Sequence, residues 1–351
     1  MDKNASRYYG QIELLRFIFS ILIVYYHLTP ILFEINPNVT LYHTLSQHNN
    51  PVGKHVVICF FIISGFFFEM SKCYNKYNVQ QFFIQKFIRL WPILAFSIIV
   101  NMHSKSDLMN LFFINSGMGI ITKGASNPAS WFSCNLFWLF LIFFLIFKVP
   151  NVLYRRNAAL FIISVLGLSL IAQQKTGLYC SPATEMLPFL TNGWVYGITG
   201  MSIGILLAHL IPTFKNNSKY YIYFAQSILA IYFIYILTFH KVAFETSYYI
   251  LVFLILFYLI ICNSSFSSLK CPLFNISGAC SYSIYMMQFP CFYYMRKLMN
   301  HGILKMASPL GNVILWVSIC AFVGIVVHFV IERPAVSFLQ RKLGTNKIYS
   351  V

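Results

Sequence analysis

The chain has 351 residues, of which 58% are hydrophobic, 18% aromatic and only 9% charged, and its mean hydropathy is +0.69. Soluble globular domains average about 25% charged residues, so this composition excludes that class and predicts a polytopic membrane protein. Lys and Arg outnumber Asp and Glu by 25 to 8. In a membrane protein such an excess follows from the positive-inside rule and from contact with anionic lipid. We therefore expect membrane lipid as a partner and no nucleic acid.

Ten membrane spans can be assigned from the apolar runs. They cover residues 11–32, 55–70, 87–102, 130–147, 158–172, 186–208, 220–239, 247–262, 277–295 and 310–331. The segment 108–122 is apolar but short and contains two glycines, which favours a re-entrant or interfacial segment over a crossing. The sequence thus predicts an all-α, polytopic helix bundle. The domain expected is a single transmembrane domain over residues 1–340, followed by a short tail at 341–351.

The charges of the loops and the first residues of the chain predict how the helices are oriented in the membrane. Most Lys and Arg residues fall on the side of the N-terminus, which predicts that both termini and the tail are cytoplasmic. Basic residues precede the first apolar run, but that run is long, carries Arg16 and lacks an A-x-A cleavage pattern. It is therefore predicted to be an uncleaved span and not a signal peptide. The nine cysteines are scattered and form no CxxC or Cys/His cluster, so no metal site is predicted.

The first span carries an arginine and a histidine eleven residues apart, Arg16 and His27. Eleven residues make about three helical turns, so both side chains lie on one face, separated by about 16 Å along the axis. Arg16 is either an interfacial anchor, with Glu13 as its partner three residues earlier, or a phosphate-binding guanidinium. His27 is either a satisfied buried residue or a general base. Pro30 predicts that the helix ends or kinks just beyond His27, near the outer mouth of a cavity.

Two further motifs offer a packing interpretation and a binding one. In the second span, Gly65 after Ser64 allows close approach of a ligand or of another helix. Lys86 and Arg89 share one helix face at the start of the third span. They are either ordinary positive-inside charges or the holders of an anionic headgroup or a nucleotide phosphate.

The last third of the chain adds two more candidates. The run 277–285 is rich in small residues for helix packing, and it places Tyr282 and Tyr285 on one face, beside Ser281, where they could line a polar cavity. Glu332 is one of only eight acidic residues and ends the tenth span. Pro334 is expected to stop that helix. Glu332 either marks the membrane interface or belongs to the site.

Taken together and in this order, these features resemble acyltransferase family 3, the membrane-bound acyltransferases that modify bacterial surface carbohydrates. The resemblance covers the whole chain. The matching residues are Glu13, Leu15, Arg16 and His27, then Phe61, Ser64, Gly65 and Phe66, then Arg89, Leu90 and Pro92, then Trp131 and Phe132, and near the C-terminus Ser281 to Tyr285 and Ile331 to Pro334.

The resemblance implies an O-acyltransferase of the bacterial cytoplasmic membrane. Its co-substrate would be a cytoplasmic acyl-CoA, acetyl-CoA in the expected case, with no permanently bound cofactor. Its acceptor would be a hydroxyl of a cell-surface or envelope carbohydrate or of a lipid-linked intermediate. The family pattern implies that His27 takes the proton from this hydroxyl. The implied donor-binding residues are Arg16, Lys86, Arg89, Glu13 and Glu332, with Glu332 positioning Arg16 or the donor. The implied pocket residues are Ser64, Gly65, Ser281, Tyr282 and Tyr285, with Ser64 and Tyr282 as walls near His27.

Two departures from the family pattern concern the site. Lys86 stands where relatives commonly have an arginine, which keeps the charge and loses the bidentate fork. Gln288 stands where many relatives have a histidine, which indicates that catalysis does not depend on this position here. A polytopic polysaccharide transporter or flippase is the competing function, although no internal repeat is evident. The acceptor, the acyl length and the oligomeric state are left open by the sequence.

Overall fold

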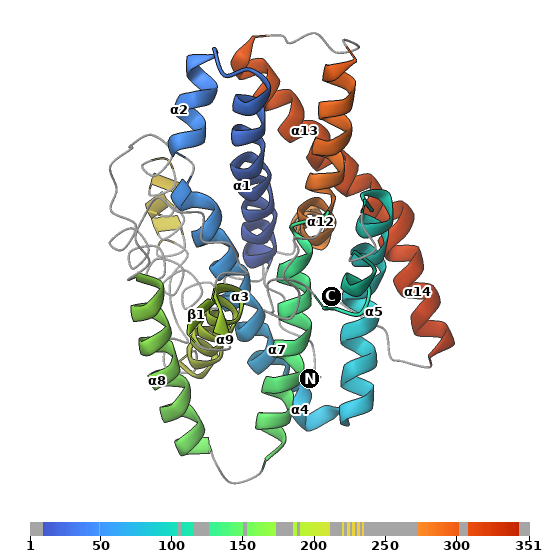
Figure 1. The fold of residues 1–351 in the computed structure, drawn as a ribbon. Coiled ribbons are helices and arrows are strands. Elements are labelled where there is room, and N and C mark those ends of the chain that lie inside the picture. Colours follow the sequence, from blue (N-terminus) through green and yellow to red (C-terminus); the bar gives the residue numbers. More distant parts are fainter. Residues whose placement is uncertain are drawn as a thin grey trace.

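The protein folds into a bundle of long helices (Figure 1). The computed structural model describes residues 10–48, 50–103, 107–114, 126–149, 153–172, 185–187, 190–210, 272–301 and 308–343, with scattered positions between 220 and 234. The first half contains α1 (Gly10–Ile35), α2 (Thr40–His48), α3 (Asn50–Ser71), α4 (Cys73–Lys76), α5 (Val79–Val100), α6 (Asp107–Asn110) and α7 (Ser130–Lys148). The second half contains α8 (Leu153–Ala172), β1 (Glu185–Leu187), β2 (Leu190–Thr191), α9 (Asn192–Leu210), α12 (Pro272–Asn300), α13 (Pro309–Val327), a π-helical turn (His328–Glu332) and α14 (Arg333–Lys342).

The long helices confirm a largely helical membrane protein. Within the described residues, five segments are long and apolar enough to cross a membrane: Gly10–Ile35, Val56–Lys76, Val79–Val100, Ser130–Lys148 and Pro309–Lys342. The predicted spans 220–239 and 247–262 lie outside the continuously described residues. The total of ten spans and the cytoplasmic placement of the termini therefore stay predictions.

Several predicted boundaries are wrong, each for a local reason. The second span is longer than expected, because α3 begins at Asn50. The sixth does not begin as a helix, since β1 and β2 form a short antiparallel hairpin before α9. Pro30 lies inside α1, which continues to Ile35, so the helix does not end beyond His27. Pro334 does not stop the last helix either. A π-helical turn precedes it, and Pro334 takes one of the first positions of α14, where its missing N–H costs nothing.

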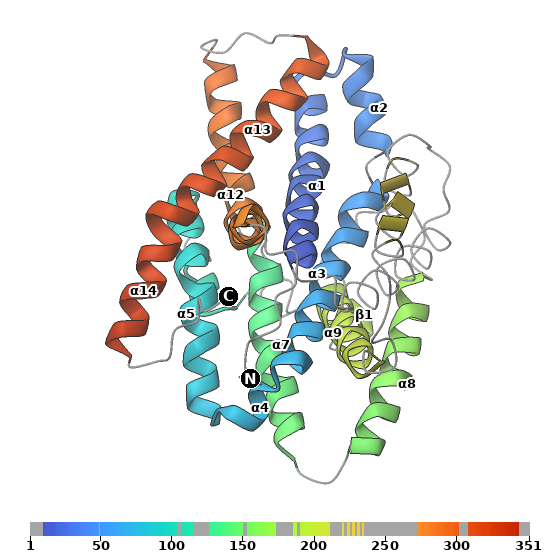
Figure 2. The ribbon, with the colours of Figure 1, turned by 180° about the vertical axis from the view of Figure 1, so that it is seen from behind.

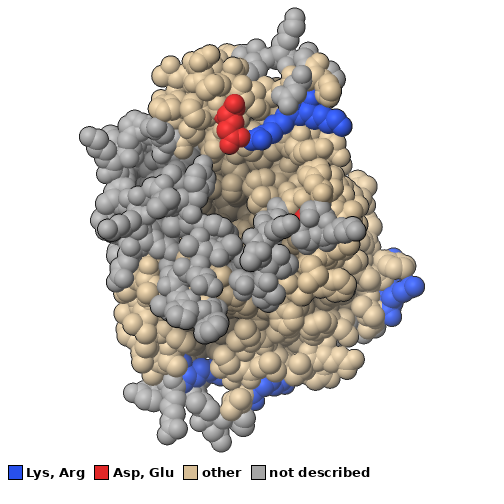
Figure 3. Space-filling model, in the orientation of Figure 1, with Lys and Arg blue, Asp and Glu red and all other residues tan. Residues whose placement is uncertain are grey.

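The helices alternate in direction between two ends of the molecule. We call the end that holds α2, the end of α12 and the start of α13 the α2 end, and the end that holds α4 the α4 end (Figures 1 and 2). Helices α1 and α12 run toward the α2 end, whereas α3 and α7 run away from it. On the face shown in Figure 3, the Lys and Arg side chains that are coloured lie near the margins, and the described surface between them belongs mostly to uncharged residues. This pattern is what a lipid-facing surface requires.

Close helix contacts position the site. Gly65 on α3 faces α9, where an added Cβ would overlap the carbonyl of Met201. Gly278 on α12 faces α1, where an added Cβ would overlap the carboxylate of Glu13. These two positions need glycine because main chain or a charged group occupies the space of a side chain. Helix α1 is thereby held against α12, and α3 against α9.

The described residues that follow α5 form hydrogen bonds that support α5 and α7. Helix α6 is a single turn, and its buried Asp107 accepts hydrogen bonds from the Ser126 backbone and hydroxyl at 2.8 and 2.6 Å. The indoles of Trp91 and Trp138 donate to carbonyls of residues 111 and 113 at 3.0 Å. Residues 115–125 lie outside the described residues, so the re-entrant or interfacial segment expected at 108–122 stays a prediction.

Candidate functional site

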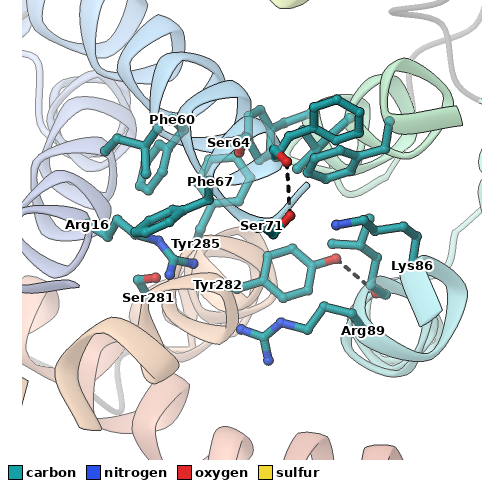
Figure 4. Close-up of a pocket in the computed structure, with 16 residues that line it drawn as sticks. Arg16, Phe60, Ser64, Phe67, Ser71, Lys86, Arg89, Ser281, Tyr282 and Tyr285 are labelled. Carbon is teal, nitrogen blue, oxygen red and sulfur yellow. Dashed lines mark hydrogen bonds between the residues drawn. The ribbon is translucent and has the colours of Figure 1, made fainter. Parts of the chain in front are cut away.

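A cavity of about 340 Å³ lies among α1, α3, α5, α7 and α12 (Figure 4). This volume is at the lower end of the range for small-molecule sites, roughly 300–1,000 Å³. Its walls are mostly aromatic and aliphatic, with cations and a few hydroxyls among them. The lining residues are Arg16, Phe60, Ile63, Ser64, Phe67, Phe68, Ser71, Lys86, Arg89, Leu90, Phe132, Leu136, Phe140, Ser281, Tyr282 and Tyr285.

Three cations from two helices reach this one cavity. Arg16 comes from α1 and donates to Glu13 at 2.8 Å, which confirms the predicted pairing. Lys86 and Arg89 come from one face of α5, as predicted, and Figure 4 shows their nitrogens and the guanidinium of Arg16 around the ring of Tyr282. Such a group of cations in a mostly apolar cavity favours a ligand with an anionic end and a thin apolar part.

Lys86 differs from the two arginines in what surrounds it. Its ammonium lies 3.8 Å from the ring centroid of Phe140 and 5.1 Å from that of Phe82. Within the part of the chain that the structure describes, no carboxylate is within salt-bridge distance of it. The aromatic faces therefore hold the ammonium by cation–π attraction, and its charge is not neutralised by a neighbouring acid.

Glu332 binds Arg89 and not Arg16, so the expected contact with Arg16 is wrong, while a role in positioning the donor stays a prediction. Its carboxylate is fully buried and accepts from Arg89 at 3.1 Å and from the Ser283 hydroxyl at 2.5 Å. It also lies 2.7 Å from Nδ1 of His328, four residues earlier. These two residues bound the π-helical turn, a local irregularity that is often found at functional sites. Glu332 therefore holds Arg89 in place from behind the cavity wall.

The predicted pocket residues divide between the cavity wall and the helix packing. Ser64, Ser281, Tyr282 and Tyr285 line the cavity. They do so on the side of the cations, so the expectation that Ser64 and Tyr282 lie near His27 was wrong. The hydroxyl of Tyr282 donates to the carbonyl of Leu90 at 2.9 Å and lies 3.1 Å from the Ser133 hydroxyl. Tyr282 is thus fixed between helices, which leaves its ring on the cavity wall.

Gly65 is not on the cavity wall. It packs against α9, so the packing interpretation was the correct one. Successive residues on a helix are rotated by about 100°. Ser64 therefore faces the cavity, and Gly65 faces the neighbouring helix.

Three aromatic side chains close the cavity toward the α2 end, and we call them the aromatic layer: Phe60, Phe132 and Tyr285. Each is the lining residue nearest that end on its own helix. Their ring centroids are 5.9 Å apart for Phe60 and Phe132, 6.3 Å for Phe60 and Tyr285, and 5.4 Å for Phe132 and Tyr285. Each ring thus contacts the other two, and together they form the wall of the cavity nearest the α2 end.

His27 lies beyond the aromatic layer. It is eleven residues after Arg16 on α1, and it meets Gln288, three residues after Tyr285 on α12. Its Nδ1 is 3.0 Å from the Gln288 amide oxygen. The rings of Tyr26 and Phe289 flank the imidazole at centroid distances of 4.7 and 4.9 Å. Arg16 and His27 both face α12, as the spacing predicts, although His27 is not on the cavity wall.

The sequence did not single out several residues of this arrangement. Gln288 departs from the family pattern, which indicated no role in catalysis, yet it is the hydrogen-bond partner of His27. Nothing in the sequence distinguishes Phe60 from the others among the 36 phenylalanines. His328 stands in the terminal motif, and its contact with Glu332 could have been predicted, because a histidine and an acid four residues apart on a helix are within contact distance.

The match to known proteins extends over this whole arrangement. A family model described as an acyltransferase domain, that of acyltransferase family 3, matches residues 9–333, which include α1 and the buried Glu332. Neither the curated proteins nor the solved structures yielded a match.

Proposed function

This chain belongs to acyltransferase family 3, and we propose that it transfers an acyl group, acetyl in the simplest case, from a cytoplasmic acyl-CoA to a hydroxyl of an envelope carbohydrate. Its apolar helices make it a multi-pass membrane protein. The proposed location is the bacterial cytoplasmic membrane, with α1 starting on the cytoplasmic side. The observation that carries the proposal is a cavity that holds three cations, Arg16 of α1 with Lys86 and Arg89 of α5, and a histidine farther along α1, His27.

The cationic cavity suits the donor. Coenzyme A is polyanionic at its nucleotide end and carries its thioester on a long thin arm. Arg16, Lys86 and Arg89 would hold phosphates, the two arginines with their fork geometry and Lys86 as a point charge. The aromatic and aliphatic walls would hold the pantetheine arm. Because Glu13 and Glu332 each back one arginine, the guanidinium groups stay oriented before the donor arrives.

His27 would carry out the proton transfer. As the acceptor hydroxyl oxygen attacks the thioester carbonyl, a neutral imidazole takes its proton, and a C–O bond forms. The tetrahedral intermediate then collapses, the C–S bond breaks, and the imidazolium returns the proton to the leaving thiolate. The products are an ester and coenzyme A with a free thiol. No donor to the oxyanion is assigned among the described residues.

The distance between the two parts fits this scheme. Arg16 and His27 are about 16 Å apart along α1, about half the thickness of a bilayer core. An arm that is anchored at the cations would reach His27 only by passing the aromatic layer. The rings of Phe60, Phe132 and Tyr285 must therefore separate when the thioester is delivered, and they keep the two sides apart when no donor is bound.

The experiment uses the full-length protein in membranes with labelled acetyl-CoA. Replacing His27 by alanine should abolish acylation of envelope glycans, as measured by mass spectrometry, while binding of the donor stays unchanged. The matched control is His43→Ala, because His43 is an exposed histidine on α2. If His27→Ala retains wild-type transfer, the assignment of the base is wrong.

The same experiment separates the competing function. A polysaccharide flippase needs no acyl-CoA, so membranes that contain it would show neither acyl transfer nor thioester hydrolysis. If the wild-type protein moves glycan across the membrane and adds no acyl mass, the acyltransferase proposal fails.

A further inference from the structure

The hydrogen bonds around Gln288 determine which nitrogen of His27 carries hydrogen. Gln288 is fully buried between α1 and α12. Its Nε2 donates to the carbonyl of Tyr285, one turn earlier on the same helix, at 2.8 Å. Its Oε1 lies 3.0 Å from Nδ1 of His27. The side-chain amide therefore bridges the main chain of its own helix and the imidazole of the other.

The orientation of this amide is fixed by chemistry. A main-chain carbonyl can only accept, so the group that bonds it must be the NH₂ of the amide. The amide oxygen then faces His27. An amide oxygen can also only accept, so Nδ1 of His27 must carry the hydrogen. In a neutral imidazole the lone pair is then on Nε2.

Packing also restrains the imidazole. The packed rings of Tyr26 and Phe289 limit rotation of the imidazole. The ring is thus held by both hydrogen bonding and packing.

We propose that Gln288 is a positioning residue that holds His27 in the Nδ1–H tautomer, so that Nε2 is the atom that takes the proton from the acceptor hydroxyl. The part of this inference that concerns proton transfer rests on the function proposed above. The tautomer itself does not, because it follows from the hydrogen bonds alone.

The first test is spectroscopic and needs no activity. Nitrogen NMR spectra of the full-length protein with ¹⁵N-labelled histidine are recorded at a pH at which the imidazole is neutral, and the His27→Ala spectrum identifies the signals of His27. We expect a protonated Nδ1 and an unprotonated Nε2. A protonated Nε2, or a mixture of the two tautomers in the wild-type protein, overturns the proposal.

The second test is kinetic. Gln288→Met keeps the size of the side chain and removes the acceptor, so kcat should fall about 10- to 100-fold, the range seen when the partner that orients a histidine ligand is lost. The KM for the donor should not change, because Gln288 does not line the cavity. Gln288→Glu still offers an oxygen to Nδ1–H and should recover kcat relative to Gln288→Met. Gln340→Met, at a buried glutamine on α14, is the matched control.

The outcomes distinguish this proposal from the function itself. If Gln288→Met keeps the wild-type kcat, or if Gln288→Glu is no better than Gln288→Met, Gln288 does not position the base. If the wild-type protein transfers no acyl group at all, the proposed function fails, while the nitrogen spectrum still decides the tautomer. The histidine spectrum of each variant, outside the His27 signals, reports whether the fold is retained.

Discussion

Arg16 and Arg89 reach the cavity from opposite sides, and each is held by one carboxylate. The pair of Arg16 and Glu13 forms within one helix turn, so its geometry could be predicted from their spacing. The pair of Arg89 and Glu332 joins residues 243 positions apart, so no local pattern could have identified it. The two arginines therefore offer different tests.

Arg16→Lys should raise the KM for acyl-CoA about tenfold, with a small effect on kcat. Lysine retains the charge and loses the second parallel N–H of the fork, which is worth about one charge-assisted hydrogen bond. The measurement is initial-rate kinetics with varied donor. Arg341→Lys, on the exposed face of α14, is the control. A donor KM equal to that of the wild type would show that Arg16 is an anchor and not a phosphate ligand.

Glu332→Gln should lower both stability and donor affinity. The change removes one charge from a buried group that also binds Ser283 and His328, and it removes the carboxylate charge that faces the guanidinium of Arg89. Breaking a buried ion pair costs about 3–5 kcal/mol. Thermal unfolding in detergent and donor titration would measure the two effects.

The control for this change is a second carboxylate at the surface. Glu34 pairs with Arg296 at an exposed position, and exposed pairs are worth about 0–1 kcal/mol. Glu34→Gln should therefore leave both the unfolding temperature and the donor affinity near those of the wild type. An equal loss in Glu34→Gln and Glu332→Gln would contradict the role given to the buried network.

At the level of the helices, what could be predicted was the face that each motif presents. The spacing of Lys86 and Arg89, and of Tyr282 and Tyr285, correctly indicated shared faces that line one cavity. What could not be predicted was which helix each face meets. Ser64 and Gly65 are adjacent in sequence, yet one faces the cavity and the other faces α9. Such partners are set by tertiary packing, which a single sequence does not specify.

The aromatic layer follows from packing of this kind, since α3, α7 and α12 each contribute one ring. Phe132→Ala should shift donor preference toward longer acyl groups, because it removes one of the three rings and leaves space between the other two. The ratio of kcat/KM for butyryl-CoA to that for acetyl-CoA should rise about tenfold. This is the lower end of the change in kcat/KM that one or two methylene groups of a substrate cause in a hydrophobic pocket.

Phe140→Ala is the matched control for Phe132→Ala. Phe140 lines the same cavity beneath Lys86, far from the layer. It should weaken donor binding through Lys86 without changing the acyl preference. An unchanged acyl preference in Phe132→Ala would mean that the arm takes another route to His27.

At the level of the whole molecule, the function depends on which end faces the cytoplasm. Acyl-CoA is a cytoplasmic metabolite, so the cationic cavity must be reached from the cytoplasm for the proposed reaction to occur. The loop charges predict this orientation, although Arg296, Lys297 and Lys305 are exceptions at the opposite end. The positive charge at that end is smaller than the sequence suggests, because Arg296 is paired with the carboxylate of Glu34. The start of α1 and the end of α14 both lie away from the α2 end (Figure 1), so the loop charges predict the cytoplasmic side for both.

Single cysteines at the two ends test this orientation directly. Lys297 lies in the last turn of α12 at the α2 end, and Lys342 ends α14; both are exposed. A membrane-impermeant thiol reagent should label Lys297→Cys in intact cells and Lys342→Cys only in inside-out vesicles. The wild-type protein, with its native cysteines, gives the background. The reverse pattern would place the cationic cavity on the side without acyl-CoA, and the donor would then have to be a different molecule. The expected pattern would instead leave His27 and Gln288 on the side from which an envelope carbohydrate approaches.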